Sequence, residues 1–436
     1  MATFIEELRR RGRIAQVTDE AGLARHLGSG RADERRAYIG YDPTADSLTI
    51  GNMTTIMLLA HFQRAGHTPV VVAGGGTGLI GDPSGKSSER QLLTREKVAE
   101  NVRSQMRIFG TILDFSPGVS NRAVIVDNAD WLTKMSFLDA LRDVGKHFRV
   151  NEMIQRDSVR DRLENREQGI SYTEFSYMIL QAYDFLHLHR SMGVTLQMGG
   201  SDQWGNIVAG TDLIRKVGAA TGQVDPVAFG LTTPLVTKAD GTKFGKTESG
   251  AVWMTADRTS PYALYQFWLN ADDSLVVNYL NTFTFLPVER IAELADSHAR
   301  NPGQRDAHRA LAAAATELLH GPTERANAEL ASKALFSGDV SGLPEKLLDE
   351  VFANVPGNTF AKSRLDGAGV PLLDFLVETA LASSKREAKE FLAGGSVLVN
   401  GEKAAADAAL TAKHLLHGKV TAIRRGKKNW FLARWA

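Results

Sequence analysis

Two apolar strands separated by one helix lie near the start of the chain, and this unit restricts the possible fold more than any other feature. Residues 36–41 (Arg-Ala-Tyr-Ile-Gly-Tyr) read as an apolar strand, and residues 48–64 as an amphipathic helix with Ser47 as its N-cap. Residues 69–73 contain three consecutive valines, which is typical of a strand buried on both faces of a parallel sheet. A strand, a helix and a second buried strand in this order predict a parallel α/β sheet.

The same alternation continues through the first half of the chain. Helical patterns over 94–109, 137–144 and 173–188 alternate with strand-like runs at 123–126 and 194–198. We therefore expect a doubly wound parallel sheet, a fold that binds ligands at the carboxyl ends of its strands.

A chain of 436 residues is long enough for several domains. Residues 260–335 are helical in pattern and rich in Ala, Leu and Glu, residues 344–369 contain scattered Gly and Pro, and residues 372–436 have helices and a strand of their own. We expect an α/β domain at 1–235, a lysine-bearing loop with an α-helical domain at 236–342, a linker at 343–368 and a small α+β domain at 369–436.

The composition excludes several classes of protein. Lys plus Arg number 51 and Asp plus Glu number 50, so no overall field attracts the chain to nucleic acid or membrane, and any such affinity must be local. The absence of cysteine excludes disulfides, thiolate nucleophiles and Cys-ligated zinc. The N-terminus lacks the apolar core of a signal peptide, and no run of 18 apolar residues follows. These features predict a soluble cytoplasmic protein with no membrane partner.

A glycine-rich turn directly follows the second strand. Residues 76–81 have the Gly-x-Gly-x-x-Gly spacing of a dinucleotide site, but a proline follows where that site requires a helix, which argues against an NAD-dependent dehydrogenase. A P-loop would require glycine where Ile80 stands. The remaining interpretations are a tight turn with solvated charges, or a loop whose amides receive phosphate together with Lys86 and Arg90, while Asp82 receives a cation.

Three polar residues share one face of an otherwise apolar helix. Tyr177, Gln181 and Asp184 stand at positions i, i+4 and i+7. Buried polar groups need partners, so this stripe either satisfies itself in the core or lines a pocket for a polar ligand. The segment 197–206 adds amides and a carboxylate among glycines, which permit a close approach of the backbone. Two neighbouring polar clusters favour the pocket.

A lysine-rich loop spans residues 237–247. Lys238, Lys243 and Lys246 stand among turn-forming residues, and Phe244 is the only apolar residue that can anchor them. Such a loop can close on a polyphosphate and stabilise its charge as a leaving group forms. The alternative is a solvated surface turn.

Taken in order, these segments closely resemble those of the bacterial tyrosyl-tRNA synthetases, a family of class I aminoacyl-tRNA synthetases. The resemblance spans nearly the whole chain. It implies a Rossmann-like catalytic domain, an α-helical anticodon-side domain and a C-terminal domain similar to the S4 RNA-binding fold, in a homodimer. The six collinear motifs that carry it are 38–48, 78–83, 171–177, 199–206, 238–247 and 260–262.

The resemblance implies that the chain activates L-tyrosine with ATP to tyrosyl-adenylate and pyrophosphate, and then transfers tyrosine to the 3′ end of tRNA(Tyr). It implies that ATP brings Mg²⁺, with no protein-bound metal or organic cofactor and no covalent enzyme nucleophile. The tyrosine-binding residues it implies are Tyr38, Asp82, Tyr177, Gln181, Asp184, Gln197 and Gln203. Those on the ATP side are Gly40, Asp42, Gly51, Gly200, Asp202 and Lys246. Those around the phosphates, which would be catalytic, are Thr44, Thr49, Asn52, Lys86, Arg90, Lys243, Lys246 and Thr247.

One motif departs from the family. The class I signature His-Ile-Gly-His stands here as Thr-Ile-Gly-Asn, residues 49–52. Asn52 can still donate through its amide, whereas Thr49 is shorter and uncharged. Exchanging a charge-assisted bond for a neutral one costs about 1 to 2 kcal/mol, so activation would be roughly tenfold slower and Thr49→His should accelerate it. The alternative is a paralogue with weakened or lost catalysis that acts as an RNA-binding or resistance protein.

The C-terminal end is basic although the whole chain is neutral. Residues 382–401 are similar to the helix and strand of the S4 fold, and residues 413–436 contain seven Lys or Arg and no acid. This charge and the aromatics Trp430 and Phe431 suit an RNA backbone contact, while a charged surface tail is the alternative. The expected tRNA contacts are Lys385, Arg386, Arg424, Arg425, Lys427 and Lys428.

Overall fold

The computed structural model describes residues 2–82, 93–156, 159–160, 163, 170–222, 226–242, 244–247, 250–353, 355–426 and 429–436. The chain forms two compact units. Unit 1 comprises Met1–Thr259 with Ala271–Leu319, and unit 2 comprises Ser260–Asn270 with His320–Ala436. Among the described residues, no helix has the length and apolarity needed to cross a membrane.

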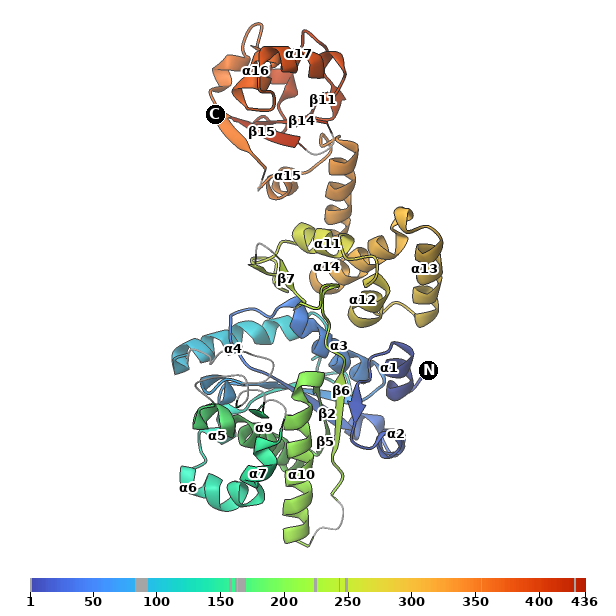
Figure 1. Ribbon diagram of the computed structural model, residues 1–436, viewed down its shortest axis with the longest axis vertical. Helices are drawn as coiled ribbons and strands as arrows, with labels where there is room; N and C mark the ends of the chain where they lie inside the picture. The colour runs from blue at the N-terminus through green and yellow to red at the C-terminus, as the bar shows by residue number, and fades with distance from the viewer. Residues whose placement is uncertain are drawn as a thin grey trace. The chain divides into compact units, whose positions relative to one another are not determined.

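Unit 1 is built on a six-stranded sheet with the order β1-β6-β5-β2-β3-β4 (Figure 1). Only β1 runs antiparallel to its neighbour, so the predicted doubly wound parallel sheet is confirmed. The chain progresses outward from β2 to β4 on one side and from β5 to β6 on the other, which places the switch point between β2 and β5. The strands are β1 (Gln16–Val17), β2 (Arg36–Tyr41), β3 (Thr68–Ala73), β4 (Val124–Asp127), β5 (Val194–Gly200) and β6 (Phe229–Thr233).

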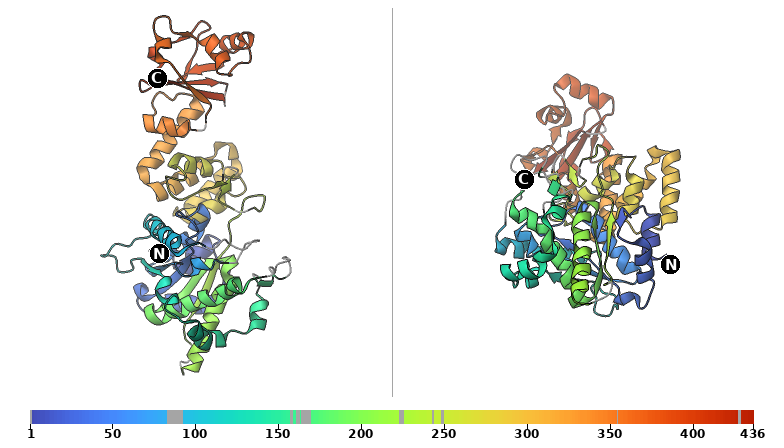
Figure 2. Two further views of the ribbon diagram at one scale, coloured as in Figure 1. Left: turned by 90° about the vertical axis from the view of Figure 1, so that its left-hand side faces the viewer. Right: turned by 60° about the horizontal axis from the view of Figure 1, so that its bottom comes forward.

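Helices cover this sheet because its central strands are buried on both faces. Tyr38 and Val70 pack in one cluster with residues of α9 and α10, while the alternate residues Ile39 and Val71 are buried as well. Figure 1 shows α9 and α10 side by side next to β2 and β5, and Figure 2 shows them from two further sides. The helices of unit 1 are α1 (Phe4–Arg10), α2 (Glu20–Leu27), α3 (Ile50–Arg64), α4 (Arg95–Phe109), α5 (Ala129–Leu132), α6 (Phe137–Asp139), α7 (Val150–Ile154), α9 (Tyr172–Met192), α10 (Trp204–Ala220), α12 (Val276–Phe283), α13 (Val288–Arg300) and the first part of α14 (Asp306–Ser337).

Two helix predictions differ from the structure in detail. Helix α3 begins at Ile50 with Thr49 as its N-cap, so the predicted cap at Ser47 is wrong. The segment before it is extended because it bonds to a later part of the chain: the Met254 amide donates to the Leu48 carbonyl at 2.8 Å. The helix expected over 137–144 consists of the short α6 followed by a π-helical turn.

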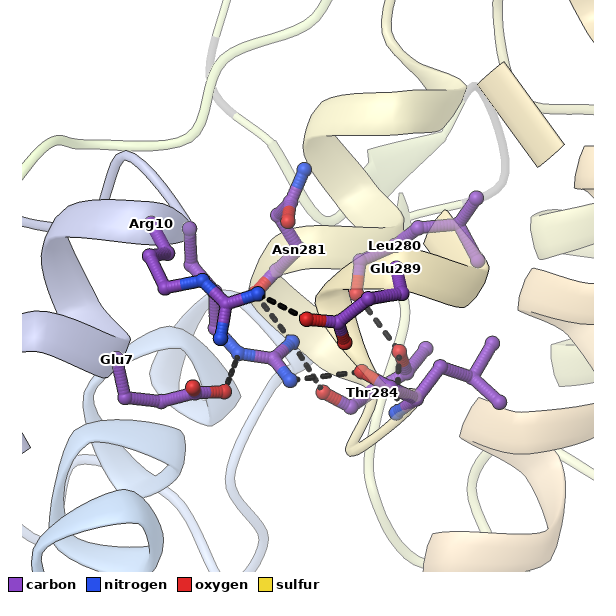
Figure 3. A network of polar contacts seen from close by, with 8 residues as sticks. Glu7, Arg10, Leu280, Asn281, Thr284 and Glu289 are labelled. Atoms are coloured by element: carbon purple, nitrogen blue, oxygen red, sulfur yellow. Dashed lines mark hydrogen bonds and ion pairs between the residues drawn. The ribbon is translucent and has the colours of Figure 1, made fainter. Parts of the chain in front are cut away.

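A buried arginine joins the first helix to the helical part of unit 1. Arg11 donates to the backbone carbonyls of Thr284 at 3.1 Å and Leu286 at 2.7 Å, just beyond the end of α12. The neighbouring Arg10 forms an ion pair with Glu289 of α13, as Figure 3 shows. Cationic side chains at a helix C-terminus satisfy carbonyls that lack partners within the helix. These contacts therefore fix the end of α12 to the end of α1 within unit 1.

Unit 2 contains a five-stranded sheet with the order β12-β11-β14-β15-β9, in which β9 runs parallel to β15 and the other pairs are antiparallel. A separate ladder joins β10 and β13. The strands are β9 (Gly357–Phe360), β10 (Val370–Pro371), β11 (Val397–Val399), β12 (Glu402–Lys403), β13 (Ala409–Leu410), β14 (Val420–Arg425) and β15 (Asn429–Trp435). The helices are α11 (Pro261–Leu269), the second part of α14, α15 (Glu345–Val351), α16 (Leu372–Glu378) and α17 (Lys385–Ala393).

Two of the expected domain boundaries are wrong. The segment 343–368 is no linker, because it contains α15 and β9, and β9 pairs with the C-terminal strand of the sheet. The helical region at 236–342 is divided between the two units at a kink in α14, where Gly321 has φ 84° and Pro322 follows. Proline lacks the N–H that would continue the helix, so the two parts of α14 belong to different cores.

Candidate active site

A cavity of about 530 Å³ opens at the switch point of the sheet, at the carboxyl ends of β2 and β5. Its walls come from β2, β5, the turns that follow β3 and β4, the start of α3 and one face of α9. The expected site residues that line this one cavity are Tyr38, Gly40, Asp42, Thr44, Thr49, Gly51, Asn52, Asp82, Tyr177, Gln181, Asp184, Gln197, Gly200, Asp202 and Gln203.

One end of the cavity combines a buried hydroxyl with a buried carboxylate. Tyr38 on β2 is 1 % exposed, and its hydroxyl has no hydrogen-bond partner among the described residues. Asp184 on α9 accepts from the Asn128 amide at 2.9 Å and from the Trp131 indole N–H at 2.7 Å. Burial raises the pKa of Asp184 to about 7, although these two hydrogen bonds act to lower it. This end of the site therefore offers a donor and an acceptor to one polar group of a ligand.

Sequence reasoning missed Asn128 and Trp131. The Asn128 side-chain oxygen accepts from the Gly76 backbone at 2.8 Å, and its amide also donates to the Thr77 hydroxyl at 2.9 Å. This arrangement fixes the orientation of the amide, so it can only donate toward Asp184. Asn128 directly follows β4, and a polar residue at the carboxyl end of a parallel strand was the signal that could have identified it, whereas Trp131 lies in α5.

A hydrogen-bonded chain continues across the middle of the cavity. The Thr77 hydroxyl donates to Asp42 Oδ1 at 2.8 Å, and the Tyr177 hydroxyl donates to Asp42 Oδ2 at 3.0 Å. Burial and the neighbouring charges of Asp42 and Asp82 raise the pKa of Tyr177 well above its usual range. The hydroxyl therefore stays protonated and serves as a donor to Asp42.

The far end of the cavity has a third carboxylate, that of Asp82. The Gln203 amide donates to Asp82 Oδ2 at 2.8 Å. The Asn206 amide donates to the Gln181 side-chain oxygen at 3.0 Å, and Asn206 is a further residue that sequence reasoning missed. The buried Gln197 side-chain oxygen has no partner among the described residues, and Gln197 on β5 is the register neighbour of Tyr38 on β2. A carboxylate and a side-chain amide oxygen on one cavity wall suit a cationic group.

The residues of the departing signature motif lie at the start of α3. The Thr49 backbone N–H and hydroxyl both donate to Asn52 Oδ1, at 3.0 Å and 2.9 Å. Thr44 lies in the loop after β2, and the Asn101 and Gln105 amides of α4 hold that loop through the Pro43 and Ala45 carbonyls.

The lysine loop is only partly described. Its expected anchor is present: Phe244 is buried, with ring centroids 5.0 Å from Tyr279 and 5.2 Å from Phe283 of α12. Gly245 has φ 80°, and a Cβ there would lie 3.2 Å from the Ile50 side chain, so the loop backbone packs against the start of α3. Strand β7 (Lys246–Thr247) pairs with β8 (Gly250–Ala251). Lys86, Arg90 and Lys243 lie outside the described residues.

The expected RNA contacts in unit 2 have different environments. The Lys385 and Arg386 side chains are exposed, although each forms an ion pair, with Asp374 and Glu390. The Arg425 guanidinium lies 4.8 Å from the centroid of the Phe391 ring. Lys427 and Lys428 lie outside the described residues.

Arg424 and Phe431 do not fit the expected surface role. Arg424 is 9 % exposed, and its guanidinium donates to the Ser337 carbonyl at 3.2 Å and lies 5.4 Å from the centroid of the Trp430 ring. It satisfies carbonyls at the end of α14, so its guanidinium is not the exposed surface group that was expected. Phe431 is buried in the core of the unit. A basic pattern cannot show which face of a strand meets a neighbouring helix.

Comparison with known proteins gives consistent results along the whole chain. A family model described as "tRNA synthetases class I (W and Y)" matches residues 31–337, and one described as "Tyrosine--tRNA ligase SYY-like C-terminal domain" matches residues 348–433. A tyrosine–tRNA ligase of Opitutus terrae is 47 % identical over 433 residues, which is 99 % of each chain. One of Geobacillus stearothermophilus is 48 % identical over 437 residues, covering 99 % of this chain and 100 % of its own.

Among solved structures, a C-terminally truncated mitochondrial tyrosyl-tRNA synthetase of Aspergillus nidulans is 31 % identical with a TM-score of 0.69. The match covers 77 % of this chain and 95 % of that one.

Proposed function

The chain belongs to the class I tyrosyl-tRNA synthetases, and from this premise we propose how its cavity divides the reaction among its residues. Its activity is the ATP-dependent joining of tyrosine to tRNA; the alternative of a relative without catalysis finds no support in matches that extend over the full length. The observation that carries the residue roles is that Tyr38 and Asp184 share one cavity with Asp82.

The buried hydroxyl and carboxylate form the phenol end of the tyrosine site. Tyr38 donates to the substrate hydroxyl, which in turn donates to Asp184. Trp131 and Asn128 hold the Asp184 carboxylate in place, and the fixed Asn128 amide keeps one of its oxygens occupied. A phenylalanine side chain would leave the buried Tyr38 hydroxyl without a partner and would not supply the hydroxyl that donates to Asp184, so discrimination arises from the cost of these missing hydrogen bonds.

The carboxylate of Asp82 forms the ammonium end, together with the side-chain oxygen of Gln181. The support is their position on the cavity wall and the amide of Gln203, which orients the carboxylate. Tyr177 acts mainly through Asp42, to which it donates. Gln197 completes the pocket with a buried oxygen that has no partner among the described residues.

The nucleotide occupies the side of the cavity formed by Gly40, Asp42 and Gly200 with Asp202. The substrate carboxylate attacks the α-phosphorus in line, and pyrophosphate leaves. No side chain forms a covalent bond in this step, so the protein contributes positioning and charge. Mg²⁺ enters with ATP as part of the substrate. The groups assigned to the departing pyrophosphate are Thr44, Asn52, Lys86, Arg90, Lys243, Lys246 and Thr247.

The protein acts as a homodimer in the cytoplasm. Support for a subunit interface comes from apolar side chains exposed on α6, the π-helical turn and α7, where a single chain leaves them in water. These side chains are Phe137, Leu138, Leu141, Val150 and Ile154. Unit 2 contacts tRNA through exposed basic residues that include Lys385 and Arg386.

The ammonium end is tested with Asp82→Asn and with tyrosine lacking its amino group. The variant should raise the KM for L-tyrosine at least tenfold in tyrosine-dependent ATP–pyrophosphate exchange and leave the KM for ATP within twofold. The amino-free analogue should bind wild-type protein and the variant equally, since it lacks the charge that Asp82 would pair. An Asp82→Asn protein with an unchanged KM for tyrosine would show that the cation is bound elsewhere.

A further inference from the structure

We propose that Thr49 is a positioning residue that locks the Asn52 side chain with its amide nitrogen directed into the nucleotide side of the cavity. The proposal rests on the activity given above. It makes the two departures from the His-Ile-Gly-His signature one coupled unit, in which Asn52 contacts the nucleotide and Thr49 acts through Asn52.

The orientation of the Asn52 amide follows from two donors that converge on one of its atoms. The Thr49 backbone N–H lies 3.0 Å from Asn52 Oδ1, and the Thr49 hydroxyl lies 2.9 Å from the same atom. A backbone N–H can only donate, so the atom it meets must be the amide oxygen. The Nδ2 group is then directed away from Thr49, and it donates to none of the described residues.

Hydrogen bonds fix the backbone around Thr49, so the two donors that orient the Asn52 side chain have fixed positions. Thr49 is extended, and the segment 48–50 bonds to the segment after the lysine loop: the Ile50 backbone N–H donates to the Val252 carbonyl at 3.1 Å, and Thr49 forms a bridge with Trp253. The Asn52 backbone N–H donates to the Thr49 carbonyl at 2.9 Å. Asn52 therefore has little freedom at either its backbone or its side-chain oxygen.

The Asn52 Nδ2 group faces the cavity. Thr49, Gly51 and Asn52 all line the cavity, and Gly245 of the lysine loop packs against this turn, with its Cβ position 3.4 Å from the Gly51 amide nitrogen. The neutral Nδ2 donor thus lies at the positive N-terminus of the 15-residue helix α3, beside the loop whose lysines meet the phosphates. Fixing the donor before the nucleotide arrives lowers the ordering cost in the transition state.

This coupling reverses the expectation from the sequence for Thr49→His. An imidazole keeps the backbone N–H but removes the hydroxyl donor, so Asn52 loses one of its two anchors. We now expect Thr49→His alone to slow activation, and the double change Thr49→His with Asn52→His to restore it at least in part.

The test compares four variants in tyrosine-dependent ATP–pyrophosphate exchange. Thr49→Val, which keeps the shape and removes the hydroxyl, should lower kcat three- to tenfold with the KM for tyrosine within twofold. Thr49→Ser keeps the donor and should recover most of the rate. Asn52→Ala should lose at least as much as Thr49→Val, and adding Thr49→Val to Asn52→Ala should cost less than a further twofold.

Controls separate this role from helix capping and from failure of the activity itself. Thr3 is the N-cap of α1 and lies outside the cavity lining, so Thr3→Val removes a cap hydroxyl and should leave the exchange kinetics unchanged. Wild-type protein without tyrosine-dependent exchange would contradict the activity. With an active wild type, the lock is refuted if Thr49→Val retains full kcat, or if it costs the same factor with and without the Asn52 amide.

Discussion

The buried carboxylate of Asp184 makes a quantitative prediction about stability and pH. Burial raises its pKa from an ordinary 3.8 to about 7 in the folded protein. The unfolded chain therefore loses this proton first as the pH rises, and the free energy of unfolding falls through the window from about pH 4 to pH 7. The loss amounts to about 1.4 kcal/mol per pH unit and ends near pH 7, so between pH 5 and pH 8 this one group lowers the free energy of unfolding by about 3 kcal/mol.

The substitution Asp184→Asn removes the titration but also one acceptor. The carboxylate accepts from Asn128 with one oxygen and from Trp131 with the other, and an amide has a single oxygen. The lost bond costs about 1 to 3 kcal/mol at every pH. We expect the variant to be less stable than wild type at pH 5, and the difference to shift in favour of the variant by about 3 kcal/mol by pH 8.

Urea unfolding of both proteins at pH 5, 6, 7 and 8 measures this shift. Asp184 lies in unit 1, so the transition of unit 2 serves as an internal reference and should respond equally in both proteins. A difference between the variant and wild type that stays constant within 1 kcal/mol across this range would refute a raised pKa at Asp184.

Three further changes follow from the same structure. Tyr38→Phe removes a buried hydroxyl without a partner among the described residues, so it should raise the midpoint of thermal unfolding or leave it unchanged, while the KM for tyrosine rises two- to tenfold. Arg424→Met should lower the stability of unit 2 by about 1 to 3 kcal/mol in urea unfolding and leave the salt dependence of tRNA binding unchanged; a smaller salt slope would make Arg424 an RNA contact after all. Deleting residues 369–436 should abolish tRNA charging and spare tyrosine-dependent exchange. The product should aggregate in light scattering, because the deletion removes the apolar side chains that bury Phe352. Loss of exchange as well would show that unit 1 depends on this region.

The parts of the fold that the sequence predicted well are those set by local patterns. Strand β2 was expected at 36–41, where it lies, because buried residues fill a short run bounded by turn formers. The N-cap of α3 was wrong because the extended segment before it pairs with residues about 200 positions later. Strand β9 was missed for the same reason, since its partner β15 lies about 70 residues away and Gly357 reads as a loop residue.

The candidate site was predictable where motifs hold its residues together. Tyr177, Gln181 and Asp184 share a helix face, so their convergence on one cavity followed from periodicity. Asn128 and Trp131 were missed because single polar residues after a strand resemble any turn. The lock between Thr49 and Asn52 was also missed, because residue types give the donors available but not the bonds they form.

The central claim is that the cavity recognises an aromatic hydroxyl at the end formed by Tyr38 and Asp184. ATP–pyrophosphate exchange by the unmodified protein, measured with L-tyrosine and then with L-phenylalanine at matched concentrations, tests it most directly. The account predicts exchange that requires tyrosine and a kcat/KM for phenylalanine at least a hundredfold lower, since the hydrogen bonds of the substrate hydroxyl to Tyr38 and Asp184 are then both lost. Comparable exchange with both amino acids, or exchange that needs neither, would contradict it.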